Sequence, residues 1–105
     1  MQFTSFLENG YLTIVLTGEI DHHRAKQYIQ AISAKIEAYT PRVCVLDFEQ
    51  VTFVDSSGIA VVINSLRNVA RIGGKLLLLG LQDQPMKVFK TAGVDKLVDI
   101  KENIL

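Results

Sequence analysis

The fold is decided by residues 42–71, which read RVCVLDFEQVTFVDSSGIAVVINSLRNVAR. Apolar side chains run almost without interruption through Val43–Leu46, and this predicts a strand over Arg42–Phe48 that is covered on both faces. After a connector over Glu49–Val54, apolar residues recur at helical spacing, which predicts a helix over about Ser57–Arg71. A strand that leads through a short turn into an amphipathic helix is the repeating unit of α/β proteins. The turn of this unit carries two serines.

The residues before this unit predict a hairpin and a helix. Phe3–Leu7 and Tyr11–Thr17 have the composition of strands, and the Asn9-Gly10 pair between them is a strong hairpin signal. Asp21 is suited to cap the next helix, because its carboxylate can accept hydrogen bonds from unpaired amides in the first turn. Apolar residues at helical spacing then predict a helix over His22–Tyr39.

The residues after the unit predict another strand, a short helix and a last strand. Gly73-Gly74 ends the preceding helix, and the leucine run of Lys75–Leu81 is typical of a buried strand. Asp83 is expected to cap a short helix that ends just before Gly93. Leu97–Ile100 is expected to form the last strand.

This order of elements predicts a small α/β domain that spans residues 1–105 as a single unit. Helices between successive strands imply right-handed crossovers and a mixed, mostly parallel sheet, with the N-terminal hairpin as an antiparallel edge. Because the strands are apolar throughout, helices are expected to cover both faces of the sheet.

The composition excludes several classes of protein. Lys and Arg number 11, as do Asp and Glu, so the chain has no electrostatic footprint for nucleic acid or an anionic membrane. Cys44 is the single cysteine, which rules out an internal disulfide and fits a reducing compartment. The first residues lack the pattern of a signal peptide, and the aliphatic runs are too short to span a membrane. We therefore expect a cytoplasmic protein without membrane or direct nucleic-acid partners.

The strongest motif is the turn Phe53-Val54-Asp55-Ser56-Ser57-Gly58-Ile59. One interpretation is a helix cap, since Asp and Ser are common helix starters. The other is an exposed serine at a helix N-terminus, where the amides carry about half a positive charge and can hold a phosphate. A phosphoserine would add about −1.5 to −2 charge and would act on a docked partner with little change in fold. The local chemistry leaves both interpretations open.

Enzymatic and metal-binding interpretations find little support. A nucleophilic serine needs a base within reach, and the only imidazoles are those of His22 and His23, which lie at the start of another helix. The serine turn also lacks the Gly-x-Ser-x-Gly pattern of hydrolases. Adjacent histidines on a helix diverge, and neither Cys44 nor a third histidine lies at metal-ligand spacing from them. Gly73-Gly74-Lys75 lacks the other residues of a P-loop. We expect no catalytic residue, no metal and no cofactor.

Three motifs together resemble those of a known family. Gly-Glu-Ile-Asp-His-His at 18–23, Val-Asp-Ser-Ser-Gly-Ile at 54–59 and Gly-Gly-Lys at 73–75 are similar, in order and spacing, to the motifs of anti-sigma factor antagonists. These are small STAS-domain proteins, and the resemblance covers almost the whole chain. The double histidine favours the anti-sigma F branch of endospore-forming bacteria. The resemblance implies a STAS-type domain with three or four helices.

The resemblance also implies a phosphorylation switch. The serine directly after the motif's aspartate, here Ser56, is phosphorylated in that family by the anti-sigma factor, which is also a serine kinase. The unphosphorylated form binds this kinase with its nucleotide, so that the sigma factor is released. Phosphorylation blocks the binding, and a PP2C-like phosphatase restores it. The alternative is a STAS interaction module of another pathway, such as a general-stress or scaffold component, with a different partner.

The residues that the resemblance places on the partner surface flank the serine turn. They are Glu19, Asp21, His22, Asp55, Ser56, Ser57, Gly58 and Ile59. Gly58, which has no side chain, is expected to let another backbone come close. Family members often end in a further helix, whereas only Lys101–Leu105 follow the last predicted strand here. This departure is expected to leave some apolar surface uncovered.

Overall fold

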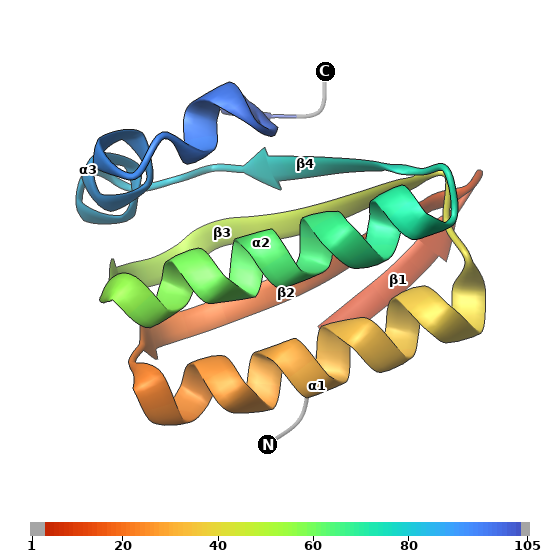
Figure 1. Ribbon diagram of the computed structural model, residues 1–105, viewed down its shortest axis with the longest axis horizontal. Helices are drawn as coiled ribbons and strands as arrows, with labels where there is room; N and C mark the ends of the chain where they lie inside the picture. Colours follow the sequence, from red (N-terminus) through yellow and green to blue (C-terminus); the bar gives the residue numbers. More distant parts are fainter. Residues whose placement is uncertain (1–3, 104–105) are drawn as a thin grey trace.

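The computed structural model describes residues 4–103 of the chain, and in this range strands and helices alternate after an initial hairpin (Figure 1). The elements in chain order are β1 (Thr4–Glu8), β2 (Tyr11–Ile20), α1 (His22–Tyr39), β3 (Val43–Val54), α2 (Ser56–Arg71), β4 (Lys75–Leu79), α3 (Asp83–Thr91), the 3₁₀ helix η1 (Val94–Lys96) and β5 (Asp99–Lys101). The three α-helices of the described range agree with the predicted number.

The strands form one sheet in the order β1-β2-β3-β4-β5. β1 and β2 are antiparallel, and every other neighbouring pair is parallel. The hairpin turns at Asn9 and Gly10, which both have positive φ, 52° and 83°, as a tight primed turn requires. The predicted α/β fold with an antiparallel edge is confirmed.

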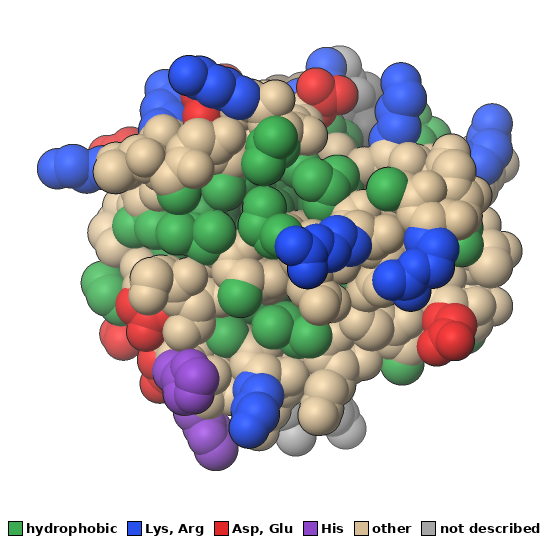
Figure 2. Space-filling view, in the orientation of Figure 1, with side chains coloured by type: hydrophobic (Ala, Val, Ile, Leu, Met, Phe, Trp, Pro, Cys, Tyr) green, Lys and Arg blue, Asp and Glu red, His purple; other side chains and the backbone are tan. Residues whose placement is uncertain are grey.

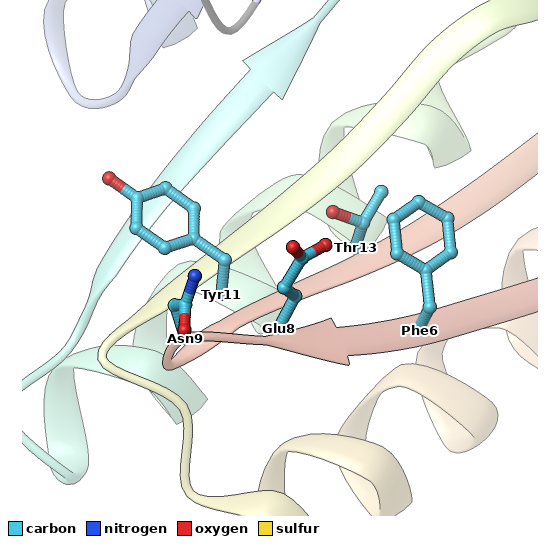
Figure 3. Close-up of a pocket in the computed structure, with 5 residues that line it drawn as sticks. All are labelled: Phe6, Glu8, Asn9, Tyr11 and Thr13. Atoms are coloured by element: carbon cyan, nitrogen blue, oxygen red, sulfur yellow. The ribbon is translucent and has the colours of Figure 1, made fainter.

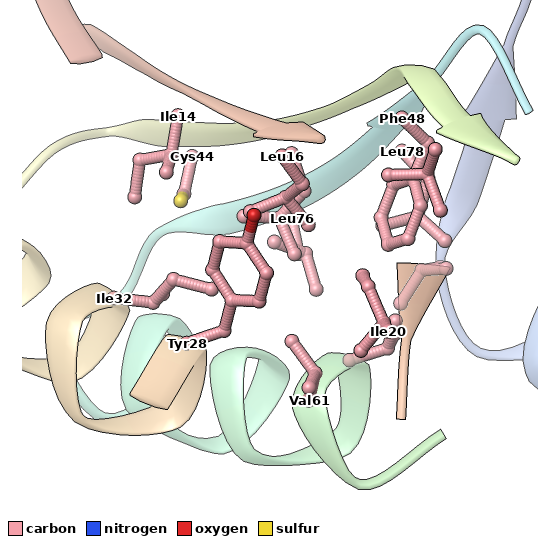
Figure 4. Close-up of a cluster of buried hydrophobic side chains, with 14 of the residues drawn as sticks. Ile14, Leu16, Ile20, Tyr28, Ile32, Cys44, Phe48, Val61, Leu76 and Leu78 are labelled. Carbon is pink, nitrogen blue, oxygen red and sulfur yellow. The ribbon is translucent and has the colours of Figure 1, made fainter. Parts of the chain in front are cut away.

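The main core lies between the sheet and the helices. In Figure 1, α1 and α2 lie side by side on one face of the sheet, and α3 lies close to the end of β3. Phe89 of α3 meets Phe48 of β3 edge to face, with ring centroids 5.5 Å apart. Figure 4 shows how side chains of the strands and helices meet in this core. Burial of alternate strand residues against the apolar stripes of the helices holds the layers together.

The opposite face of the sheet carries a small apolar cluster of its own. It consists of Val45, Leu77 and Leu79, with Val43 packed against them, and no helical residue within 4–103 belongs to it. The expectation of helices on both faces is therefore wrong for the described residues. Val45 is fully buried and is in register with Thr13 on one side and Leu77 on the other. The neighbouring strands thus help to bury Val45, whereas the sequence predicted that a helix would cover it.

A shallow hollow of about 250 Å³ lies at the hairpin end of this second face. Figure 3 shows the side chains that line it, which come from β1, β2 and the turn between them. They are Phe6, Glu8, Asn9, Tyr11 and Thr13. Phe6 and Tyr11 are exposed there, so part of the apolar surface is open to solvent.

β2 and β3 both extend further than predicted. β2 continues past Thr17 to Ile20, and Glu49–Val54, predicted as a connector, is the second half of β3. These two extensions pair with each other in parallel, from Gly18 opposite Val51 to Ile20 opposite Val54. Register shifts between the paired strands interrupt the regular alternation of side chains, and this hid the strands from sequence analysis.

Three other boundaries, those of β1, α2 and β4, differ slightly from their predicted positions. β1 is Thr4–Glu8 rather than Phe3–Leu7, and Phe3 lies outside the described residues. α2 begins at Ser56 rather than Ser57. β4 ends at Leu79 rather than Leu81, because Gly80 turns the chain with a φ of 71°.

The C-terminal part differs more from its prediction. Asp83 does not cap α3; Gln82 occupies the cap position without a side-chain hydrogen bond, and Asp83 is the first helical residue. The last strand is Asp99–Lys101 rather than Leu97–Ile100, because η1 and the turn after it take up the residues before Asp99. Ile104 and Leu105 lie outside the described residues. What was said of a C-terminal helix after Lys101 therefore stays a prediction.

Candidate functional site

Two helix starts lie side by side at one edge of the sheet. β2 and β3 are parallel neighbours that end together, with Ile20 in register with Val54. The amide of Asp55 donates a 3.3 Å hydrogen bond to the carbonyl of Ile20. Each strand is followed at once by an aspartate that caps a helix, Asp21 for α1 and Asp55 for α2. The Gly18–His23 segment therefore lies beside the serine turn, as predicted.

The two aspartates satisfy the first amides of their helices. Asp21 Oδ1 accepts from the Arg24 amide at 2.8 Å, and Asp55 Oδ1 accepts from the Ser57 amide at 2.7 Å. The bond from the Arg24 amide is the main reason that the pKa of Asp21 lies below its ordinary value of 3.8. Because Asp55 caps α2, the Ser56 side chain is left exposed as the first residue of the helix.

The predicted partner-surface residues all lie at this edge, with different exposure. Glu19, Asp21, His22 and Ser56 are exposed, Asp55, Ser57 and Ile59 are partly buried, and Gly58 is buried. His22 and Ser57 line the same small hollow between α1 and α2. Figure 2 shows the histidines at this end of the molecule with acidic side chains nearby. An exposed hydroxyl thus lies at the N-terminus of α2, directly after the aspartate that caps the helix.

Gly58 has no side chain, and this lets α2 pack closely against Val54 of β3. A Cβ atom at this position would lie 2.8 Å from Cβ of Val54, which is closer than carbon atoms approach each other. Val54 is fully buried and cannot give way easily. The atoms that crowd Gly58 thus belong to the Val54 side chain of the chain's own strand, and the predicted approach of another backbone stays a prediction.

Arg24 and Tyr28 of α1 hold the end of β2. The buried Tyr28 hydroxyl accepts from the amide of Thr17 at 3.1 Å and from Arg24 Nη2 at 3.1 Å. Arg24 Nη1 also donates to the carbonyl of Glu19 at 3.4 Å. Gly18, with a φ of 76°, leaves room for this guanidinium, since a Cβ atom there would lie 2.6 Å from Arg24 Nη1. The sequence indicated Tyr28 as a core residue and carried no signal for the role of its hydroxyl.

A largely apolar groove of about 520 Å³ borders the serine turn on its other side, between α2 and α3. Its walls include Phe53, which is 41% exposed, Ile59 and Val88. Asp55, Ser56, Gln84 and Lys87 also line it. Hydrophobic side chains gather between α2 and α3 in Figure 2. Sequence analysis missed the α3 wall, because the position where this short helix docks is set by tertiary packing.

Other reactive groups are separate from this site. Cys44 lies inside the core, where burial raises the pKa of its thiol to about 12. Within residues 4–103, no three side chains of His, Cys, Asp and Glu gather in a way that could hold a metal ion. In the same range, none of the helices combines the length and hydropathy needed to cross a membrane. The arrangement at the sheet edge provides an exposed serine hydroxyl at a helix N-terminus beside a largely apolar groove.

A family comparison agrees with this geometry. The model of the STAS domain matches residues 7–104. The chain belongs to the STAS domain family. An anti-sigma F factor antagonist of Lysinibacillus sphaericus is 34% identical to this STAS domain over 83 residues, which are 79% of this chain and 71% of the relative. An anti-sigma-B factor antagonist of Listeria monocytogenes is 26% identical over 97 residues, covering 90% of this chain and 82% of the relative.

Solved structures share the fold of this STAS domain. The anti-sigma factor antagonist SpoIIAA in its unphosphorylated form is 24% identical, with a TM-score of 0.73 over 99% of this chain and 90% of that chain. The Bacillus cell fate determinant SpoIIAA in the phosphorylated form is 28% identical, with a TM-score of 0.72 over 94% and 90% of the two chains. The resemblance inferred from the three sequence motifs is confirmed, and so is the STAS-type fold.

Proposed function

We propose that this STAS domain is an anti-sigma factor antagonist that is switched by phosphorylation of Ser56. In the unphosphorylated form it binds an anti-sigma factor serine kinase, so that the sigma factor is released. The observation that carries the proposal is the exposed Ser56 at the first position of α2, between the Glu19–His22 segment and the apolar groove. Relatives named as antagonists of anti-sigma factors, and one solved in a phosphorylated form, support it.

The proposed contact surface has a polar and an apolar part. Glu19, Asp21 and His22 offer charged and hydrogen-bonding groups that favour a basic patch on the kinase. The groove between α2 and α3 offers Phe53 and Ile59 to apolar side chains of the kinase. Ser56 lies where the two parts meet, so a change of charge at this residue affects both.

Catalysis in this proposal belongs to the kinase. Ser56 Oγ attacks the γ-phosphorus of ATP held by the kinase, the new O–P bond forms as the bond to ADP breaks, and the hydroxyl proton passes to a base of the kinase. The N-terminus of α2 tolerates the added phosphate, because its amides favour negative charge. The phosphate places about −1.5 to −2 charge at the contact surface and ends binding there. A PP2C-like phosphatase then hydrolyses the phosphoserine and restores binding.

The alternative is a STAS module of a general-stress or scaffold pathway with a different partner. Relatives of both the sigma F and the sigma-B type support keeping it as a second candidate. Binding to purified kinases of the two types, measured side by side, distinguishes the candidates. Tight binding to neither kinase would favour another partner.

Serine variants test the proposal directly. With a cognate kinase and ATP, we expect intact-mass and peptide analysis to place one phosphate on Ser56, and Ser57→Ala to be modified normally. Ser56→Ala should bind the kinase without being modified. Ser56→Asp should bind at least about tenfold more weakly, because a charge then lies in the interface.

Three results would contradict the proposal. A phosphate that maps to Ser57 would move the acceptor site, and equal affinity of Ser56→Asp and the unchanged chain would exclude a block by charge. An esterase activity that is lost in Ser56→Ala would instead indicate an enzyme.

A further inference from the structure

β3 is much longer than its neighbour β4, and this leaves half of one strand edge without a partner strand. β3 spans Val43–Val54, but β4 pairs only with Val43–Asp47. Beyond Asp47, the peptide groups of β3 that point away from β2 have no strand of residues 4–103 to bond. Backbone N–H and C=O groups near a protein core need hydrogen-bond partners.

Two glutamine side chains take the place of the missing strand. The Val54 amide donates to Gln84 Oε1 at 2.9 Å, and Gln84 Nε2 donates back to the Val54 carbonyl at 2.9 Å. Further back along β3, Gln82 Nε2 donates to the carbonyl of Glu49 at 2.8 Å. A carboxamide has the same donor and acceptor as a peptide group, so Gln84 pairs with Val54 as a neighbouring strand would.

The pair with Gln84 fixes the residue on which the serine turn is built. Val54 is directly followed by Asp55, which caps α2, and by Ser56. On the opposite edge of β3, the Asp55 amide bonds to the Ile20 carbonyl, so the end of the strand is held from both sides. Gly58 also packs on the Val54 side chain. A shift of Val54 would therefore move the start of α2 and the Ser56 hydroxyl with it.

We infer that Gln84 is a positioning residue for phosphorylation of Ser56, and this inference rests on the proposed function. It acts through Val54 and not on the phosphoryl group. Its carboxamide holds the acceptor turn in one place relative to the rest of the kinase-binding surface. Ser56 then presents its hydroxyl in a single geometry in the complex, which favours in-line transfer.

The test compares Gln84→Met with Gln82→Met. Methionine has nearly the length of glutamine but cannot form either bond. In Gln84→Met we expect kcat of the kinase for this substrate to fall about tenfold, with KM changed less than about twofold, since two hydrogen bonds that hold the turn are lost. Gln82→Met removes a bond from the same segment at a distance from the turn, and it should leave both constants unchanged.

A second measurement needs no kinase. Hydrogen exchange followed by NMR should show a faster exchange of the Val54 amide in Gln84→Met, while the Leu46 amide in the middle of β3 keeps its protection. If Gln84→Met does not fold, Gln84→Asn keeps a neutral carboxamide on a side chain that is one methylene shorter and reaches Val54 less well. The same changes, smaller in size, are then expected.

The outcomes separate the inference from the proposed function. An unchanged kcat with unchanged exchange at Val54 would overturn the inference while Ser56 phosphorylation stands. A rise in KM alone would assign Gln84 to the docking surface and would also overturn it. If the unchanged chain takes no phosphate at Ser56, the proposed function fails, and faster Val54 exchange still supports the structural part of the inference.

Discussion

At the scale of single residues, Gly58 shows how closely the serine turn packs on β3. A methyl group there would lie 2.8 Å from Cβ of the fully buried Val54. We expect Gly58→Ala to lower the free energy of unfolding by about 1–3 kcal/mol, because an overpacked contact strains strand and helix. Urea unfolding followed by circular dichroism measures this change. The sign of this change is informative, because replacing glycine by alanine in a helix without a steric clash raises the free energy of unfolding by about 1 kcal/mol.

Ala60→Gly is the matched control for that experiment. Ala60 is exposed in the first part of α2, so its replacement reports the intrinsic difference between the two residues, a loss of about 1 kcal/mol. If Gly58→Ala raised the free energy of unfolding by the amount that Ala60→Gly removes, the turn would be packed more loosely than the structure indicates.

The residue scale also shows what sequence reasoning could reach. The Asp21 cap and the Asn9-Gly10 turn were predictable, because a cap and a tight turn depend on residues next to one another. Gln84 was not, because its carboxamide bonds Val54, 30 positions away in the sequence. Whether Asp55 or Ser56 caps α2 also needed the structure, since the two side chains have the same local chemistry.

At the scale of elements, α1 holds the end of β2 through the Tyr28 hydroxyl. Tyr28 is buried, and Tyr28→Phe removes its partly buried hydrogen bonds with the Thr17 amide and the Arg24 guanidinium. We expect the free energy of unfolding to fall by about 1–3 kcal/mol, because the Thr17 amide loses a partner. Tyr39→Phe, in the same helix but 50% exposed, should change it by less than about 0.5 kcal/mol. Equal effects of the two changes in chemical denaturation would show that the buried hydroxyl does not anchor β2.

The second half of β3 was the main element that the sequence did not reveal. Its side chains do not alternate regularly, because the register with β2 shifts twice. Among the described residues it has no neighbouring strand on the β4 side, and it lacks the apolar run that is typical of a central strand. The docking of α3 on this open edge was hidden for the same reason, and with it one wall of the groove beside Ser56.

At the scale of the whole molecule, the balance of charge hides a local difference. Basic and acidic residues number 11 each, so composition alone gives no electrostatic footprint for nucleic acid or an anionic membrane and says nothing of a local patch. The fold, however, brings Glu19, Asp21 and Asp55 to one edge of the sheet beside Ser56. A neutral chain therefore gathers three carboxylates at one edge, where Arg24 and Lys87 also lie, and attraction of these carboxylates to a basic partner depends on topology rather than on net charge.

These exposed carboxylates predict how association with the kinase depends on salt. If Glu19 attracts a basic patch of the kinase, the association rate constant should fall about tenfold as the salt concentration rises from about 0.05 M to about 0.5 M. Glu19→Gln should lower the rate at low salt and flatten this dependence. Glu37→Gln removes the same charge from an exposed position that shares a hollow with Arg71, at the far ends of α1 and α2, and it should change neither. Stopped-flow measurements on both variants decide the question. An equal change in the two would mean that net charge, and not the edge beside Ser56, steers the encounter.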